Sequence, residues 1–78
     1  MNQQLIFNED FHFDTTRQAV AFSCLSCGLR INCYIRLPAG MQPDDWLHQI
    51  KQDSLCWEDK TEQALEDDAV NENGELWF

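Results

Sequence analysis

Basic residues, glycine, proline and long apolar runs are all scarce in this chain. Its 78 residues include five Lys and Arg against 14 Asp and Glu, three Gly and two Pro. So few basic side chains can contact little phosphate, and we expect neither nucleic acid nor an anionic membrane surface as a partner. No run of about 18 apolar residues is present to span a membrane. The first ten residues contain neither a basic stretch nor a long apolar one, so we expect no signal peptide and a cytoplasmic protein.

The composition is instead that of a small folded protein. Hydrophobic residues make up 44% of the chain and aromatic residues 12%, which is too apolar for a disordered acidic tail. The length predicts a single domain over residues 1–78. The formal net charge of −9 lies in the second half of the chain. In residues 1–40 the acidic and basic side chains balance, and they are Glu9, Asp10, Asp14, Arg17, Arg30 and Arg36.

Period-two alternation of apolar residues predicts a β-hairpin in the first half of the chain. We expect Cys24 to lie opposite Leu29, with a connection over residues 25–28 in which Gly28 supplies a positive φ. This register places the apolar residues on one face of the sheet. Those residues are Val20, Phe22, Cys24, Leu29, Ile31, Cys33, Ile35 and Leu37. Shorter strands are expected at Gln3–Phe7, Phe11–Phe13 and Glu75–Phe78.

Two helices are expected between the hairpin and the last strand. Pro43, followed by Asp44 and Asp45, is typical of a helix start, and this helix should end near Gln52. Asp53 or Ser54 can cap a second helix over about residues 55–69. Its expected buried stripe is Trp57, Thr61, Ala64, Leu65 and Asp68. The order β-β-β-α-α-β, with room for an extra short N-terminal strand, predicts an α+β fold with helices on one face of a small antiparallel sheet.

Several stretches match the pattern of a known family. They are Met1-Asn2-Gln3 with Leu5-Ile6-Phe7, Phe13-Asp14, Ala19-Val20-Ala21-Phe22, Gly28, Ile31-Asn32-Cys33-Tyr34-Ile35, Trp57-Glu58 through Glu62, Ala64, Leu65 and Gly74. On these residues the chain resembles a small bacterial family called domain of unknown function 1488. The resemblance covers nearly the whole chain and implies a compact α+β domain. It implies no activity, because the family has none assigned, and the pair Cys24 and Cys27 is not part of its pattern.

The segment Cys24-Leu25-Ser26-Cys27-Gly28 has the form of a zinc knuckle, in which a tight turn lets two thiolates face one metal. A structural zinc needs four ligands, however, and no second pair follows: Cys33, Cys56, His12 and His48 stand alone in the sequence. We therefore expect no cofactor, with Cys33 in the core and the other thiols packed or exposed. A zinc or thiol-redox module centred on Cys24 and Cys27 is the alternative hypothesis.

The sequence contains no recognisable catalytic motif. His12 and His48 are its two histidines, and neither belongs to a nucleophile or metal-binding pattern. We therefore expect no enzyme. A cysteine–histidine pair formed by tertiary proximity is the third hypothesis.

The second helix carries a row of like charges. Glu58, Glu62 and Glu66 recur every fourth residue, a spacing that destabilises an isolated helix, and Asp59 adds to the field. A row of this kind suits a basic partner, so we expect a non-enzymatic protein-interaction module, with Trp46 at the border of the acidic face. A simply solvated acidic face is the alternative. Trp77 and Phe78 on an edge strand offer another route to a partner or to a second copy, which leaves a monomer and a homodimer both open.

Overall fold

The computed structural model describes residues 5–78. Neither of its helices has the length and apolar character needed to cross a lipid bilayer. Gln3 and Gln4, expected in the first strand, lie outside the described residues. The elements follow the expected order, with the extra N-terminal strand present. They are β1 (Leu5–Phe7), β2 (His12–Asp14), β3 (Ala19–Ser26), β4 (Leu29–Arg36), α1 (Pro43–Gln52), α2 (Ser54–Glu66) and β5 (Glu75–Trp77).

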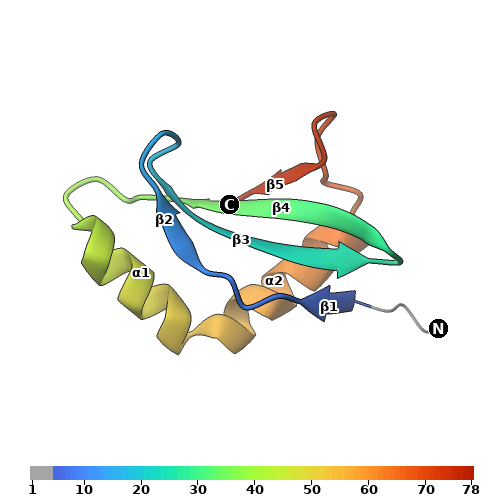
Figure 1. Ribbon diagram of the computed structural model, residues 1–78, viewed down its shortest axis with the longest axis horizontal. Helices are drawn as coiled ribbons and strands as arrows, with labels where there is room; N and C mark the ends of the chain where they lie inside the picture. Colours follow the sequence, from blue (N-terminus) through green and yellow to red (C-terminus); the bar gives the residue numbers. More distant parts are fainter. Residues whose placement is uncertain (1–4) are drawn as a thin grey trace.

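The five strands form one sheet of order β1-β3-β4-β5, with β2 also paired to β3. β1 and β2 follow one another along the same edge of β3 (Figure 1). The α+β class is confirmed, but the sheet is mixed rather than wholly antiparallel, because β5 pairs parallel to β4. The two helices between β4 and β5 explain this direction, since a crossover through helices returns the chain to the end of the sheet from which it started.

The β3–β4 hairpin is tighter than the alternation predicted. Ser26 lies opposite Leu29, and Cys24 lies opposite Ile31. The turn is therefore the two residues Cys27 and Gly28, whose φ angles of 54° and 86° match a type I′ turn. The expected register was wrong by two residues. A shift of two keeps every side chain on its face, so the predicted apolar face is retained.

The core lies between that face of the sheet and the helices. Val20, Cys24 and Cys33 are fully buried there, which confirms the prediction for Cys33. α1 contributes Ile50 and β5 contributes Leu76. In Figure 1, α1 lies at the β2 end of the sheet, while α2 runs toward β1 and the tip of the β3–β4 hairpin.

α1 has the predicted bounds, but α2 ends three residues earlier than expected. Asp68 adopts a left-handed conformation, with φ of 56°. The N–H of Ala69 then donates to the carbonyl of Ala64 at 3.0 Å, and the N–H of Asp68 donates to that of Leu65 at 3.1 Å. This pair of bonds is a Schellman motif, which ends a helix. Asp68 therefore lies exposed beyond the helix, and its place in the predicted buried stripe was wrong.

Candidate functional site

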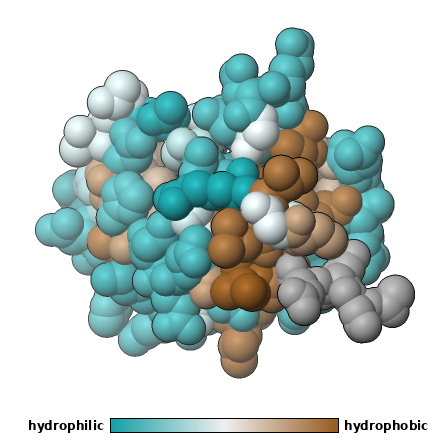
Figure 2. Space-filling model, turned by 45° about the vertical axis from the view of Figure 1, so that its right-hand side comes forward, coloured by the Kyte–Doolittle hydropathy of each residue, from teal (hydrophilic) through white to brown (hydrophobic). Residues whose placement is uncertain are grey.

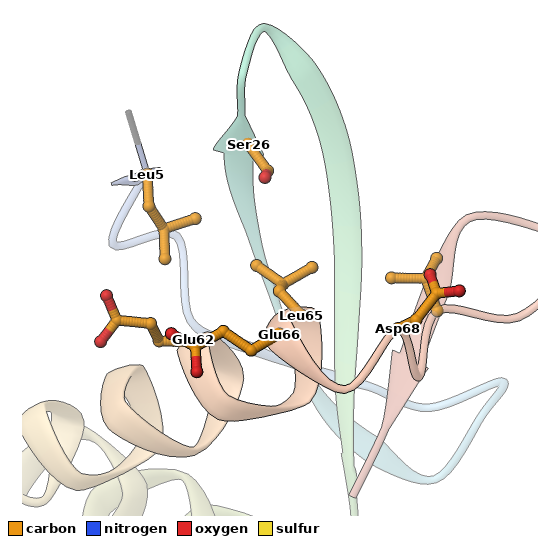
Figure 3. Close-up of a pocket in the computed structure, with 7 residues that line it drawn as sticks. Leu5, Ser26, Glu62, Leu65, Glu66 and Asp68 are labelled. Carbon is orange, nitrogen blue, oxygen red and sulfur yellow. The ribbon is translucent and has the colours of Figure 1, made fainter. Parts of the chain in front are cut away.

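A cavity of about 160 Å³ opens where the C-terminal end of α2 approaches β1 and the end of β3 (Figure 3). Its lining combines apolar and acidic side chains from four segments of the chain. The lining residues are Leu5, Ser26, Glu62, Leu65, Glu66, Asp68 and Val70. We call this the acidic cavity.

The floor and the rim of the acidic cavity come from different features of the sequence. Leu5, Leu65 and Val70 also pack against the hydrophobic core, so the core holds them in place. Glu62 and Glu66 are one helical turn apart on α2, and that spacing brings their carboxylates to one side of the helix. Asp68 joins them because the left-handed residue that ends α2 turns the chain back over the cavity. In Figure 3, Glu62 lies on the far side of Leu65 from Asp68.

The carboxylates of the cavity are not neutralised by the protein. Glu62, Glu66 and Asp68 are exposed. In residues 5–78, no Lys, Arg or His side chain forms an ion pair with any of the three. The ion pairs among the described residues join Arg17 to Asp14 and Glu75, and Arg30 to Asp10. Lys60 of α2 instead lies over the ring of Trp57, at 5.1 Å from its centroid. The cavity therefore presents uncompensated negative charge beside an apolar floor.

Apolar surface continues beyond the cavity. Leu29, the strand partner of Ser26 on the same face of the sheet, is 69% exposed. Ile6 is 53% exposed but pairs with Leu25, so it lies on the opposite face. Figure 2 brings forward the side on which the hairpin projects in Figure 1, and it shows hydrophobic residues gathered in one patch beside a hydrophilic surface. This combination suits a partner that carries both apolar and basic side chains.

The structure separates the residues predicted for the acidic face. Glu62 and Glu66 line the cavity, whereas Glu58 is half-buried one turn earlier and Asp59 is exposed outside the lining. Trp46 does not border the cavity. It packs on the core with its ring edge-on to Trp57, at a centroid separation of 6.4 Å, and its buried indole N–H has no hydrogen-bond partner among the described residues.

Five lining residues were not anticipated as part of a site: Leu5, Ser26, Leu65, Asp68 and Val70. They reach the cavity from β1, β3, α2 and the loop after α2, and no single local pattern relates them. The one available signal was the acidic end of the second helix, where Glu66, Asp67 and Asp68 follow one another.

The thiols of the zinc-knuckle motif lie in different environments. Cys24 is buried in the core, whereas Cys27 is exposed in the hairpin turn. Within residues 5–78, no cluster of three or more His, Cys, Asp or Glu side chains has a geometry that could hold a metal ion. The neighbour of Cys24 is Cys33, on the adjacent strand. The hydrogen bond that the Cys33 thiol donates to Cys24, together with burial of the side chain, raises the pKa of Cys33 far above its ordinary value.

Both histidines are exposed, and each is bound to a near neighbour. His12 Nδ1 lies 2.9 Å from the backbone oxygen of Asp10, and His48 Nε2 lies 3.1 Å from Nε2 of Gln52. In the described part of the chain, no hydrogen bond joins either ring to a cysteine. The geometry thus does not bring together the cysteine–histidine pair of the third hypothesis.

The β5 edge is partly closed to strand addition. Asn71 occupies both outward-facing backbone groups of Glu75: its side-chain oxygen accepts from the N–H at 3.0 Å, and its own N–H donates to the carbonyl at 2.9 Å. The rings of Trp77 and Tyr34 stack with their centroids 4.8 Å apart, and the ring of Phe78 packs edge-on to that of Trp57 with their centroids 5.8 Å apart. These aromatic side chains are therefore engaged within the protein.

Comparison with known proteins confirms the family resemblance and the fold. The model of a family described as "Protein of unknown function (DUF1488)" matches residues 5–78. The chain is similar to the uncharacterized protein YrdB of Escherichia coli strain K12, with 24% identity over 84 residues that cover 100% of this chain and 99% of YrdB. It is also similar to the crystal structure of a DUF1488-family protein of unknown function from Shewanella loihica PV-4. The TM-score is 0.82 at 24% identity, and the match covers 100% of this chain and 94% of the other.

Proposed function

The chain belongs to the DUF1488 family, whose description names no activity, and we propose that it is a non-enzymatic protein-interaction module that binds a basic segment of a partner protein. The proposed site is the acidic cavity at the end of α2. We place the protein in the cytoplasm as part of the same proposal, since Cys27 and Cys56 are exposed free thiols of the kind that a reducing compartment preserves.

One observation carries the proposal: three uncompensated carboxylates surround an apolar floor. The volume of about 160 Å³ is below the roughly 300–1,000 Å³ of a small-molecule pocket. A cavity of this size suits one long side chain. Lys and Arg pair an apolar stem with a charged head, and the stem can lie on Leu65 and Val70 while the head reaches Glu62 and Glu66.

The charge and the floor have different roles in binding. Carboxylates that remain exposed contribute only about 0–1 kcal/mol per ion pair, so they act mainly on encounter and orientation. The net charge of −9 attracts a basic partner from a distance. Burial of the stem and of apolar neighbours on Leu65 and Leu29 would supply most of the affinity.

A titration followed by the backbone amide NMR spectrum tests this proposal. The probes are the peptide Ac-Ala-Leu-Arg-Leu-Ala-NH2 and the analogue in which Gln replaces Arg. The analogue has the same number of residues and carries no charge. We expect saturable shifts for the Arg peptide, centred on Glu62, Leu65 and Val70, and binding of the Gln peptide weaker by about tenfold.

Matched double variants provide the control. Glu62→Gln with Glu66→Gln should weaken binding of the Arg peptide about tenfold. Asp44→Asn with Asp45→Asn removes the same charge from α1 and should leave binding nearly unchanged. Equal losses in both variants, or shifts spread over every acidic segment, would show nonspecific attraction and overturn the proposal.

A further inference from the structure

The sheet face opposite the helices carries a small hollow that is unrelated to the acidic cavity. His12, Ala21 and Tyr34 lie side by side on β2, β3 and β4. The alanine between two large side chains leaves a depression of about 70 Å³, whose walls also include Asn32 and Arg30. We call this depression the open-face hollow.

The two carboxylates that reach the hollow are already bound within the protein. Asp10 accepts the N–H of Ser23 at 2.8 Å and its hydroxyl at 2.7 Å, and Arg30 lies 3.8 Å away. Asp14 accepts two backbone N–H groups at 3.0 and 3.1 Å, and the guanidinium of Arg17 at 3.0 Å. Each carboxylate thus has an arginine beside it and internal donors on its oxygens.

The polar groups left over at the hollow are mainly donors. Arg30 Nε donates to the side-chain oxygen of Asn32 at 3.4 Å, which leaves the amide Nδ2 of Asn32 without a partner among the described residues. The hydroxyl of Tyr34 likewise has no partner among the described residues, and it is open to solvent at the hollow. The guanidinium of Arg30 adds further donors. These groups are suited to an acceptor with two oxygens.

The charges around the hollow also make it a more favourable place for an anion than the rest of the surface of this acidic protein. All three arginines of the chain lie on this face of the sheet or over it. Arg17 stacks on Tyr34 at 4.8 Å, and Arg36 stacks on Trp77 at 5.1 Å. The acidic side chains of α1 and α2 lie on the other side of the sheet.

We propose that the open-face hollow binds a single carboxylate group, supplied by a small organic acid or by the C-terminus of a peptide. Asn32, Tyr34 and Arg30 donate to its two oxygens, and Ala21 forms the floor. A volume of about 70 Å³ corresponds to two or three water molecules at about 30 Å³ each, so it holds a carboxylate but neither a nucleobase nor a sugar.

The test is an amide NMR titration at constant ionic strength with three probes: sodium acetate, the dipeptide Ac-Gly-Ala-OH and its amide Ac-Gly-Ala-NH2. We expect saturable shifts at Ala21, Asn32 and Tyr34 with acetate, with the free-acid dipeptide, or with both, and none with the amide. Tighter binding of acetate indicates a small acid as the source, and tighter binding of the dipeptide indicates a C-terminus. If neither acetate nor the free-acid dipeptide produces saturable shifts, the proposal is overturned. It is also overturned if the amide binds as tightly as the free acid.

An isosteric variant separates this site from a general charge effect. Asn32→Asp replaces the donor amide by a carboxylate and should weaken binding at least about tenfold. Asn73→Asp adds the same charge in the exposed loop before β5 and should bind as the parent does. If Asn32→Asp does not fold, Tyr34→Phe removes one donor and should still weaken binding severalfold. Unchanged binding in a folded Asn32→Asp or Tyr34→Phe protein contradicts the assignment. The shifts expected here lie on the face opposite the acidic cavity, so this proposal and the proposed function can fail separately.

Discussion

Among single residues, Asp10 does the most to join separate segments of the sheet. Between β1 and β2 the chain leaves the edge of β3, with Glu9 at a φ of 54°. Asp10 compensates for the interrupted ladder because its carboxylate binds both the N–H and the hydroxyl of Ser23, a residue that is 1% exposed. Partial burial raises the pKa of Asp10, but the hydrogen bonds from Ser23 outweigh it, and the pKa lies below its ordinary value.

We predict that Asp10→Ala destabilises the protein by about 1–3 kcal/mol, because it leaves two buried donors of Ser23 without an acceptor. Asp10→Asn should cost less, since the amide oxygen still accepts the N–H. Urea unfolding at neutral pH measures both differences. Equal stability of Asp10→Ala and the parent would contradict this role.

The same residue predicts a pH dependence. A carboxyl whose pKa is lower in the folded state stabilises that state above its unfolded pKa of about 3.9, and this contribution is lost as the pH falls through the folded value. The parent should therefore lose more stability than Asp10→Asn on acidification below about pH 4. Unfolding curves at several acidic pH values measure the loss of stability in each protein. Equal losses in the parent and in Asp10→Asn would contradict this prediction.

Among the secondary-structure elements, the end of α2 connects folding most directly to the candidate site. The Schellman motif needs a left-handed residue, which is usually glycine, and here it is Asp68. A left-handed conformation costs an L-residue about 1–2 kcal/mol, although Asp tolerates it better than most. The carboxylate also lies at the negative end of the helix dipole. Asp68 is thus unfavourable for α2 on two counts, while it adds charge to the acidic cavity.

We predict that Asp68→Gly stabilises the protein by about 1 kcal/mol, because it removes both the backbone strain and the unfavourable charge. Asp68→Asn, which removes the charge alone, should gain only about 0.3–1 kcal/mol. Thermal unfolding of the three proteins separates the two contributions. A loss of stability in Asp68→Gly would show that the side chain of Asp68 makes a favourable contact.

For the whole molecule, the two faces of the sheet differ strongly in charge. The arginines gather on the open face, where they pair with acids and stack on aromatic rings. Residues 43–68, which form the two helices and the residues beside them, carry nine of the 14 acidic side chains and both lysines. The compact state therefore concentrates like charges on one side, and this repulsion opposes folding.

We predict that added sodium chloride raises the melting temperature, because salt screens the repulsion that the net charge of −9 produces. A gain of 1 kcal/mol corresponds to about 4–8 °C for a domain of this size. The double variant Glu62→Gln with Glu66→Gln should show a weaker salt dependence. Calorimetric scans at low and moderate salt test this, and a melting temperature that falls with salt would mean that the ion pairs of the open face dominate.

Local patterns predicted much of the fold. They failed at positions where a residue other than glycine adopts a positive φ angle. Pro43 and the acids after it marked the start of α1 correctly. The turn at Cys27 and Gly28 was missed because Cys rarely adopts the positive φ that a type I′ turn requires there. The end of α2 was missed for the same reason, since Asp68 stands where glycine is usual.

The candidate site was predicted in part. The row of glutamates on α2 was found because helical spacing alone brings Glu62 and Glu66 together. Their apolar neighbours Leu5 and Val70 could not be found in this way, because Leu5 comes from β1 and Val70 from the loop after α2, and only packing brings them to the cavity. Trp46 was assigned to the border of the site because an aromatic side chain can serve either a core or a surface, and the packing against Trp57 decided between them.

The sequence by itself determined what depends on neighbours along the chain: the alternating face of the hairpin, the two helices, the acidic row and the burial of Cys33. Contacts between distant segments were decided by the tertiary structure alone. These are the parallel pairing of β5, the carboxylate of Asp10 on Ser23, the cavity between α2 and β1, and the hollow over Ala21. The physical reason is that periodicity fixes which way a side chain points within its element, whereas the partner it meets depends on how all the elements pack at once.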